Sequence, residues 1–223
     1  MVSTEVVEAD IMEEQELKSA IEKMKKDSPS RKFVESVDVA INLKDINLQD
    51  PSKRFQMEVH LPHPLDKEVK VCVLGEGSHL VEAEQIASRV INKDELDNIS
   101  REPKIAKKLA QEYDYFIATA SLMPTIGRSL GKVLGPRGKM PKPVPPTAPI
   151  EPLIKDYQSV IQIRLRQSPV IHARIATIAM DNDAIADNVL AVLRNVENKL
   201  EKGVNNIRSI YVKTTMGPAI KVN

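Results

Sequence analysis

Hydrophobic and polar residues alternate in two stretches near the amino terminus, residues 33–43 and 55–61. A period of two is typical of strands that bury one face and expose the other, as in an antiparallel sheet. Before them, residues 5–27 place hydrophobic side chains at an imperfect helical spacing, which predicts a helix ending at residues 27–30. The positions assigned to the buried side are Phe33, Val37, Val39, Ile41, Leu43, Phe55, Met57, Val59 and Leu61, and those assigned to solvent are Glu35, Asp38, Asn42, Gln56, Glu58 and His60.

The pattern changes in the middle of the chain. Two hydrophobic runs with few polar breaks, 69–75 and 115–123, alternate with helical patterns at 79–91 and 103–113. Buried strands that alternate with helices are typical of a small parallel sheet covered on both faces. Six prolines then follow between Pro141 and Pro152, which we expect to exclude a helix or a central strand there.

The last third returns to the first pattern. Alternating stretches at 160–166 and 170–177 precede a helical pattern that starts at residues 181–183 and ends at Gly203, and a final strand is predicted at 207–215. Because the two ends share one pattern and the middle has another, we predict a discontinuous outer α+β domain with an antiparallel sheet, residues 1–66 and 158–223. Residues 67–157 would form an inserted α/β domain of three layers, similar to a Rossmann fold. Two chain crossings would make a hinge.

Charge and cysteine content narrow the class of protein. The chain of 223 residues carries a formal net charge of +1, but residues 1–27 contain eight acidic and four basic side chains, so the remainder carries about +5. The longest run without an acidic residue extends from Tyr115 to Ile150. This asymmetry favours an anionic partner for part of the surface, although a solvated basic face of this size is also common.

The sequence predicts a cytoplasmic globular protein with no membrane segment. Cys72 is the only cysteine and lies in a hydrophobic run, so no internal disulfide can form and a buried packing role is expected. No hydrophobic run approaches the roughly 20 residues of a membrane helix. The amino terminus is acidic where a secretory signal would be basic and then hydrophobic.

A glycine-rich basic stretch, residues 121–143, invites comparison with phosphate-binding loops. It fails the Walker pattern, because Ile126 stands where the first glycine belongs and Val133 where the hydroxyl belongs. The dinucleotide pattern fails as well, because Leu80 replaces the third glycine after the first buried strand. Glycines at every fourth position predict a helix that another backbone, in the same domain or in a partner, approaches closely. These glycines are Gly127, Gly131 and Gly135, with Arg128 and Lys132 stacked beside them and Arg137 and Lys139 presented by the following turn.

Catalytic and metal-ligating patterns are weak. His60 and His63 flank Pro62 in a predicted loop without further histidines or cysteines nearby, so we predict no metal site. No Ser-His-Asp or paired-carboxylate spacing is present. We therefore predict that the protein is not an enzyme and needs no cofactor; the alternative is a nucleotide-binding enzyme that uses the inserted domain.

The outer domain offers a more suitable binding surface. RNA-binding surfaces combine basic groups for phosphates, hydroxyls for sugars and phosphates, and a few flat hydrophobic groups. Thr214 to Pro218 form a turn-like end to the last strand, with Gly217 permitting close backbone approach and Met216 able to lie against a base or sugar. The alternative is an ordinary solvent-exposed sheet face without a ligand, because such a face shows the same spacing of polar residues. The other candidates are Arg164 and Arg166 on one strand, His172 and Arg174 on the next, and Ser209, Tyr211, Lys213 and Thr215 on the last.

Four segments together resemble the ribosomal protein L-one family of the mobile stalk of the large ribosomal subunit, in its archaeal form. They are KFVESVDVAINL (32–43), GKVLGPRGKMPKP (131–143), VIHARI (170–175) and SIYVKTTMGPAIKVN (209–223), and the resemblance covers nearly the whole chain. It implies the same discontinuous two-domain plan. It also implies binding to large-subunit rRNA at the base of the stalk, help in releasing deacylated tRNA from the exit site, and repression of translation through the protein's own operon mRNA.

The resemblance also implies where RNA binds. Where bacterial members have a glycine-rich connection, this chain has Pro64-Leu65-Asp66, which affects the expected freedom of the hinge. Residues 121–143 would be a secondary element facing RNA or tRNA, with Arg128, Lys132, Arg137 and Lys139 as its basic groups. We expect a protein that is monomeric when free of the ribosome. The residues expected to bind RNA are Lys32, Phe33, Ser36, Arg164, Arg166, His172, Ser209, Lys213, Thr215, Met216 and Gly217.

Overall fold

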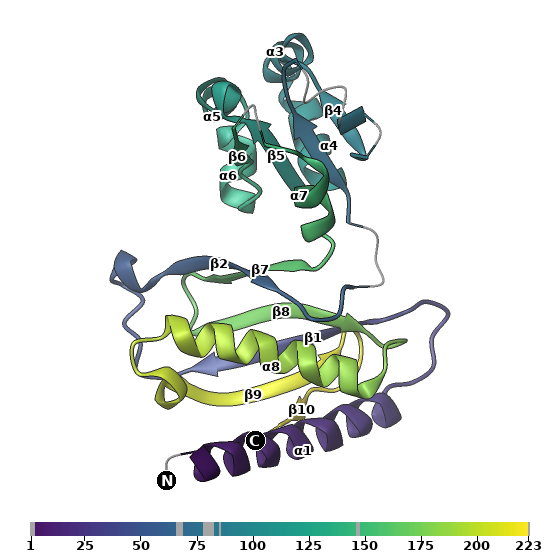
Figure 1. Ribbon diagram of the computed structural model, residues 1–223, viewed down its shortest axis with the longest axis vertical. Coiled ribbons are helices and arrows are strands. Elements are labelled where there is room, and N and C mark those ends of the chain that lie inside the picture. Colours follow the sequence, from purple (N-terminus) through teal and green to yellow (C-terminus); the bar gives the residue numbers. More distant parts are fainter. Residues whose placement is uncertain (1–2, 66–68, 78–82, 85, 146–147, 223) are drawn as a thin grey trace. The chain divides into compact units, whose positions relative to one another are not determined.

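The computed structural model describes residues 3–65, 69–77, 83–84, 86–145 and 148–222, with side chains from residue 15 onward. The chain divides into two compact units, Met1–Asp66 with Ser159–Asn223, and Lys67–Gln158 (Figure 1). Each unit has its own sheet and its own hydrophobic core. Whether the second unit is an inserted domain that moves on a hinge stays a prediction.

The first unit contains a four-stranded antiparallel sheet, which confirms the predicted antiparallel class. Its strand order is β10 (Ile220–Lys221), β9 (Ile207–Thr214), β1 (Ser36–Leu43) and β8 (Val170–Thr177). A separate antiparallel ribbon pairs β2 (Phe55–His60) with β7 (Val160–Leu165). The helices are α1 (Ser3–Asp27) and α8 (Asn182–Lys199), with short 3₁₀ turns η1 (Pro51–Lys53) and η3 (Gly203–Asn206).

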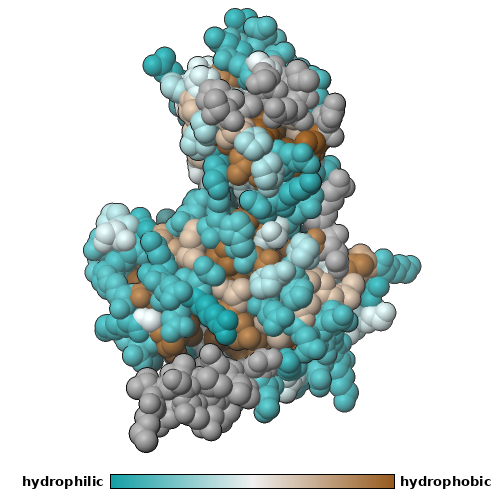
Figure 2. All heavy atoms as spheres, in the orientation of Figure 1, coloured by the Kyte–Doolittle hydropathy of each residue, from teal (hydrophilic) through white to brown (hydrophobic). Residues whose placement is uncertain are grey.

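The core of this unit lies on one face of the sheet. Every second residue of β1 is buried, from Val37 to Leu43, while the residues between them are half-exposed. Buried side chains of both helices, including Ile21 and Val189, belong to the same cluster. In Figure 1, α8 lies across the sheet, and Figure 2 shows hydrophilic residues over most of this helix-covered side, with smaller hydrophobic areas between them. Because the buried residues of β1 share a core with the helices, the half-exposed residues between them lie on the opposite face, which is the polar one.

The prediction for the start of β1 was wrong. The strand begins at Ser36, so the alternation does not extend back to residue 33. Phe33, assigned to the core, is 56% exposed, whereas Glu35, assigned to solvent, is 2% exposed. Residues 33–35 precede the ladder, and an unpaired segment need not follow the two-residue period of a strand.

The second unit contains a four-stranded parallel sheet, as the sequence predicted. Its order is β4 (Arg89–Ile91), β3 (Val71–Leu74), β5 (Tyr115–Thr119) and β6 (Lys142–Val144). Cys72 is fully buried in β3, and burial raises the pKa of its thiol to about 12. The helical elements among its described residues include α3 (Lys93–Arg101), α4 (Pro103–Glu112), η2 (Ala120–Leu122), α5 (Met123–Ser129), α6 (Gly131–Arg137) and α7 (Glu151–Asp156).

Two predictions for this unit need correction. The helical pattern at 79–91 ends in a strand, since β4 occupies residues 89–91, and residues 79–82 and 85 lie outside the described residues. The prolines were expected to exclude a helix or a central strand; the strand found there, β6, is at the sheet edge, but α7 contains Pro152, so the expectation was wrong for the helix. Pro143 lies in β6, where the side of the strand that faces away from the sheet forms no hydrogen bonds, so the missing N–H costs nothing there. Pro152 lies in the first turn of α7, where a backbone N–H would have no hydrogen-bond acceptor within the helix.

Long hydrophobic helices and metal-ligand clusters are both absent from the described part of the chain. None of its helices is long and apolar enough to cross a membrane. No group of three or more His, Cys, Asp or Glu side chains among the described residues is arranged to hold a metal ion. His63 instead pairs with Asp187, with Nε2 3.0 Å from Oδ2.

Candidate nucleic-acid interface

Two segments far apart in the sequence meet at one end of β1. We call residues 28–36 and 214–218 the loop cluster. The backbone N–H of Thr215 donates to the carbonyl of Ser36 at 3.0 Å, and the hydroxyl of Thr215 donates to the same oxygen at 3.2 Å. The guanidinium of Arg31 donates to the carbonyl of Met216 at 3.5 Å. The structure thus brings together six of the predicted residues: Lys32, Phe33, Ser36, Thr215, Met216 and Gly217.

The rim of the loop cluster is unusually hydrophobic for an exposed surface. Phe33 is 56% exposed, and Val34 and Met216 are each 62% exposed. Arg31 and Lys32 lie beside them and are exposed as well. Flat hydrophobic groups next to cations suit a ligand that has both stacked bases and phosphates.

A hydrogen-bonded network lies beneath this rim. The hydroxyls of Ser28 and Thr214 are 3.0 Å apart, and Ser28 also donates to Oε2 of Glu35 at 3.3 Å. Nε of Arg31 forms an ion pair with Oε1 of Glu35 at 2.5 Å. At Gly217 a Cβ atom would lie 2.3 Å from Oγ1 of Thr214, so any larger residue would force Thr214 to shift. Sequence reasoning missed Ser28, Arg31 and Glu35, although the i, i+4 spacing of Arg31 and Glu35 was visible.

The polar face of the sheet continues from the loop cluster. In the ladder, Asp38 of β1 stands between Lys213 of β9 and Arg174 of β8. Partial burial raises the pKa of Asp38, while the charges of Lys213, Arg174 and His172 oppose that shift. Two fixed cations, Lys213 and Arg174, therefore flank a single carboxylate, and the balance of these three charges is positive.

The next positions along the same face carry polar groups. Ala40 lies between Tyr211 and His172, so the predicted His172 belongs to this face and is exposed. The amide of Asn42 donates to the hydroxyl of Ser209 at 2.9 Å. Ser209 is thus six ladder positions from Ser36, about 20 Å along the strand at roughly 3.4 Å a residue.

Arg164 and Arg166 are not carried by a strand of this sheet. β7 is hydrogen-bonded to β2 in the separate ribbon, although it runs close to β8, whose ladder partner is β1. The grouping of the four basic residues stays a prediction. Arg164 donates to the side chain of Gln162 at 2.6 Å. Arg166 follows β7 and precedes β8, whose first residues pair with the far end of β1 from Ser36.

The glycine-rich stretch forms two short helices, α5 and α6, that meet at Leu130. A Cβ atom added at Gly127, Gly131 or Gly135 would meet no heavy atom within 4 Å, so no backbone in the described part of the chain approaches these glycines. The prediction of close packing within the domain was therefore wrong. The glycine that the local fold requires is Gly138, which ends α6 in the left-handed conformation at φ 66°.

The four basic residues of this stretch have different environments. Arg128 and Lys132 are exposed. Arg137 donates to the carbonyl of Val133 at 3.3 Å. The ammonium of Lys139 donates to the carbonyls of Ala110 and Tyr113, at 3.1 and 2.6 Å, at the carboxyl end of α4. Lys139 is thus a half-buried helix cap, which leaves Arg128 and Lys132 as the outward-facing pair.

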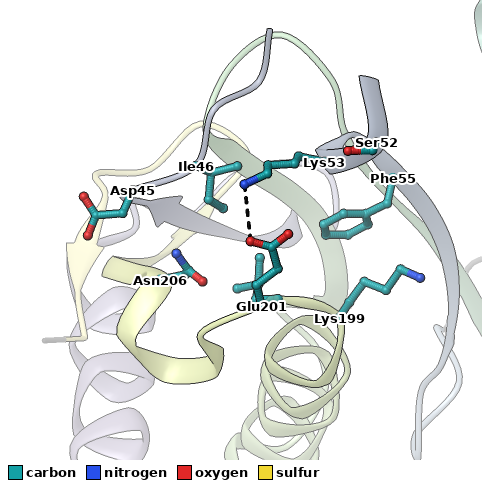
Figure 3. Close-up of a pocket in the computed structure, with 9 residues that line it drawn as sticks. Asp45, Ile46, Ser52, Lys53, Phe55, Lys199, Glu201 and Asn206 are labelled. Atoms are coloured by element: carbon teal, nitrogen blue, oxygen red, sulfur yellow. Dashed lines mark hydrogen bonds and ion pairs between the residues drawn. The ribbon is translucent and has the colours of Figure 1, made fainter. Parts of the chain in front are cut away.

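A cavity of about 200 Å³ lies elsewhere in the first unit (Figure 3). Lys53 and Glu201 point toward one another across it, with Nζ 3.3 Å from Oε2. Lys199 and Asp45 add one charge of each sign, so the lining has no net charge to attract a phosphate. None of the predicted RNA-binding residues lines this cavity.

Comparison with known proteins identifies the family. Residues 17–218 match the model described as the Ribosomal protein L1p/L10e family. The chain belongs to this family. The L1p/L10e match includes the whole loop cluster and the whole second unit, so it confirms the resemblance that the four segments indicated.

Archaeal proteins of the L1p/L10e family are similar to this chain over almost its full length. It is 46% identical over 209 residues to the large ribosomal subunit protein uL1 of Thermococcus kodakarensis, covering 93% of this chain and 97% of that protein. Identity to the uL1 protein of Pyrococcus horikoshii is 47% over 209 residues, covering 93% and 95%. For Methanothermobacter thermautotrophicus it is 44% over 210 residues, covering 94% and 99%.

Proposed function

We propose that this chain is a component of the large ribosomal subunit in the cytoplasm and binds large-subunit rRNA at the base of the mobile stalk. The loop cluster is the main contact, and the polar face of the sheet extends it. The observation that carries the proposal is the meeting of Lys32 and Phe33 with Thr215 and Met216 at an exposed hydrophobic rim. Membership of the L1p/L10e family supports it.

The chemistry of the loop cluster fits folded RNA. Phe33 and Met216 can lie against bases or sugars, and the hydroxyl of Thr215 can reach a 2′-OH or a phosphate oxygen after small rotations. Lys32, Lys213 and Arg174 supply positive charge for phosphates on either side. His172 and Ser209 lie further along the same face, whereas Arg164 and Arg166 would meet RNA only at a separate edge.

The finer functions of the family extend this proposal. A surface that fits a folded stalk RNA also fits a similar fold in the operon mRNA, so binding to the two RNAs would be mutually exclusive, and the protein would repress translation only when it exceeds its rRNA. The second unit would act as an inserted domain, with Arg128 and Lys132 facing the rRNA or the exit-site tRNA whose release the protein assists.

The test introduces a negative charge into the loop cluster. Met216→Asp should weaken binding of the full-length protein to a stalk-base rRNA fragment by about 2–3 kcal/mol, because a carboxylate would be desolvated against phosphates. Met140→Asp is the matched control, since Met140 is also exposed, at 44%, but lies in the second unit. Affinities would be measured by filter binding at one fixed salt concentration.

Two results would contradict the proposal. If the wild-type protein does not bind the fragment more tightly than an unrelated RNA of equal length, the protein is not an rRNA-binding protein of this type. If Met216→Asp and Met140→Asp weaken binding equally, the loop cluster is not the main contact.

A further inference from the structure

A buried carboxylate lies at the base of the loop cluster, where a surface for a polyanion would not be expected to keep a negative charge. Glu35 is 2% exposed. Burying a carboxylate is unfavourable unless ion pairs or hydrogen bonds compensate for the lost water. Its charge also repels phosphates at the rim above it. Glu35 is therefore unfavourable both for folding and for binding a polyanion, unless its contacts have a compensating role.

The contacts of Glu35 link the two segments of the loop cluster. One oxygen, Oε2, accepts a hydrogen bond from Ser28, whose hydroxyl lies 3.0 Å from that of Thr214. The other oxygen, Oε1, pairs with Nε of Arg31. It accepts no hydrogen bond from the described residues, so the ion pair is what offsets its burial.

Arg31 and Thr214 each act on the turn that carries Met216. The guanidinium of Arg31 donates to the carbonyl of Met216, and the carbonyl of Thr214 accepts the backbone N–H of Gly217 at 3.2 Å. Glu35 thus reaches both sides of residues 214–217, through Ser28 on one side and through Arg31 on the other. The backbone of Glu35 is also fixed, since its carbonyl accepts the N–H of Ile178 at 2.9 Å.

We propose that Glu35 is a positioning residue of the RNA interface: its carboxylate holds Arg31 and Ser28 so that Phe33 and Met216 are set at the spacing that RNA needs before RNA arrives. The proposal rests on the proposed rRNA-binding function and adds to it a residue that does not touch the RNA. Because the rim is already ordered in the free protein, RNA binding does not incur the entropy cost of ordering it.

The positioning role predicts whether Glu35→Gln strengthens or weakens RNA binding. If Glu35 acted on RNA only through its charge, Glu35→Gln would strengthen binding, because one repulsive charge near the phosphates would be removed. If it positions the rim, the same nearly isosteric change should weaken binding by about tenfold, because the ion pair with Arg31 is lost while the surface becomes more positive. The two roles therefore predict opposite changes in affinity.

The experiment compares Glu35→Gln with Glu58→Gln in the full-length protein. Glu58 is exposed on β2, so its variant makes the same change of charge outside the loop cluster. Binding to the stalk-base rRNA fragment is measured at one salt concentration. In the free protein, the ¹³C-labelled methyl signal of Met216, assigned with Met216→Leu, should shift or broaden in Glu35→Gln and stay unchanged in Glu58→Gln.

Ser28→Ala is a second variant that leaves both charges in place, and it decides the matter if Glu35→Gln does not fold. It removes the link between Glu35 and Thr214, and binding should weaken about threefold or more. Tighter or unchanged binding by folded Glu35→Gln, or a Met216 signal that does not move in either variant, would overturn the positioning role. Failure of the proposed function is distinguishable, because the wild-type protein would then not bind the fragment.

Discussion

Gly217 lies in the turn after β9, where a Cβ atom would stand 2.3 Å from Oγ1 of Thr214 and 3.3 Å from Oγ of Ser28. Thr214 is fully buried and Ser28 is its hydrogen-bond partner, so neither can move away without breaking the network. Gly217→Ala should lower the free energy of unfolding by about 1–3 kcal/mol, as overpacked substitutions do. Urea denaturation measures it.

The chain provides a matched control for this substitution. Gly127 lies inside α5, and a Cβ atom there would meet nothing within 4 Å. Gly127→Ala should therefore raise the free energy of unfolding by about 0.5–1 kcal/mol, because alanine loses less backbone entropy in a helix. Equal effects of the two substitutions would show that the close contact at Gly217 is relieved at no cost.

Lys139 illustrates a residue whose role depends on an element distant in the sequence. Its ammonium lies against the last carbonyls of α4. Lys139→Met should lower the free energy of unfolding by about 1 kcal/mol, because a cation that caps a helix carboxyl end is lost. Lys132→Met, at an exposed position of the neighbouring α6, should change stability by less than about 0.5 kcal/mol. Thermal unfolding of both variants tests the difference.

A different result for Lys139→Met would support the prediction from sequence that Lys139 faces RNA. If Lys139→Met left stability unchanged and weakened RNA binding as much as Lys132→Met did, Lys139 would be a phosphate contact. Sequence reasoning placed it on an RNA-facing turn because nothing in residues 135–139 indicates that α4 ends beside them.

The elements that could be predicted are those whose burial follows from their own period. β2, β7 and β9 alternate because one side of each faces the core, and β3 is hydrophobic throughout because it is buried on both sides. β4 could not be predicted, since its three residues carry an exposed arginine and continue a helical spacing. The break between α5 and α6 also has no local signal, because Leu130 fits either helix.

The pairing of strands was less predictable than the strands themselves. Arg164 and His172 were grouped because their strands are consecutive, but the partner of β8 is β1, more than 100 residues away in sequence. The hydrophobic faces of β1, β7 and β8 all belong to one core, so burial alone does not select the ladder partner of β8. Periodicity within one strand carries no information about that choice.

At the scale of the whole molecule, the proposed binding surface combines residues almost 200 positions apart. The residue pattern indicated the turn at residues 214–218, and the resemblance to one family added Lys32, Phe33 and Ser36. Sequence reasoning did not find the network of Ser28, Arg31 and Glu35 that joins these segments, because a buried carboxylate next to a basic loop has the same sequence pattern as a solvated one. Only the folded chain shows Glu35 at 2% exposure.

The central claim is that the loop cluster is the main rRNA contact of the full-length protein. Ultraviolet crosslinking to the stalk-base rRNA fragment, followed by mass spectrometry of the crosslinked peptides, tests it most directly. We expect the strongest crosslinks in residues 28–36 and 214–218, with weaker ones near Arg128 and Lys132. Crosslinks confined to residues 123–139, with none in the loop cluster, would contradict the account.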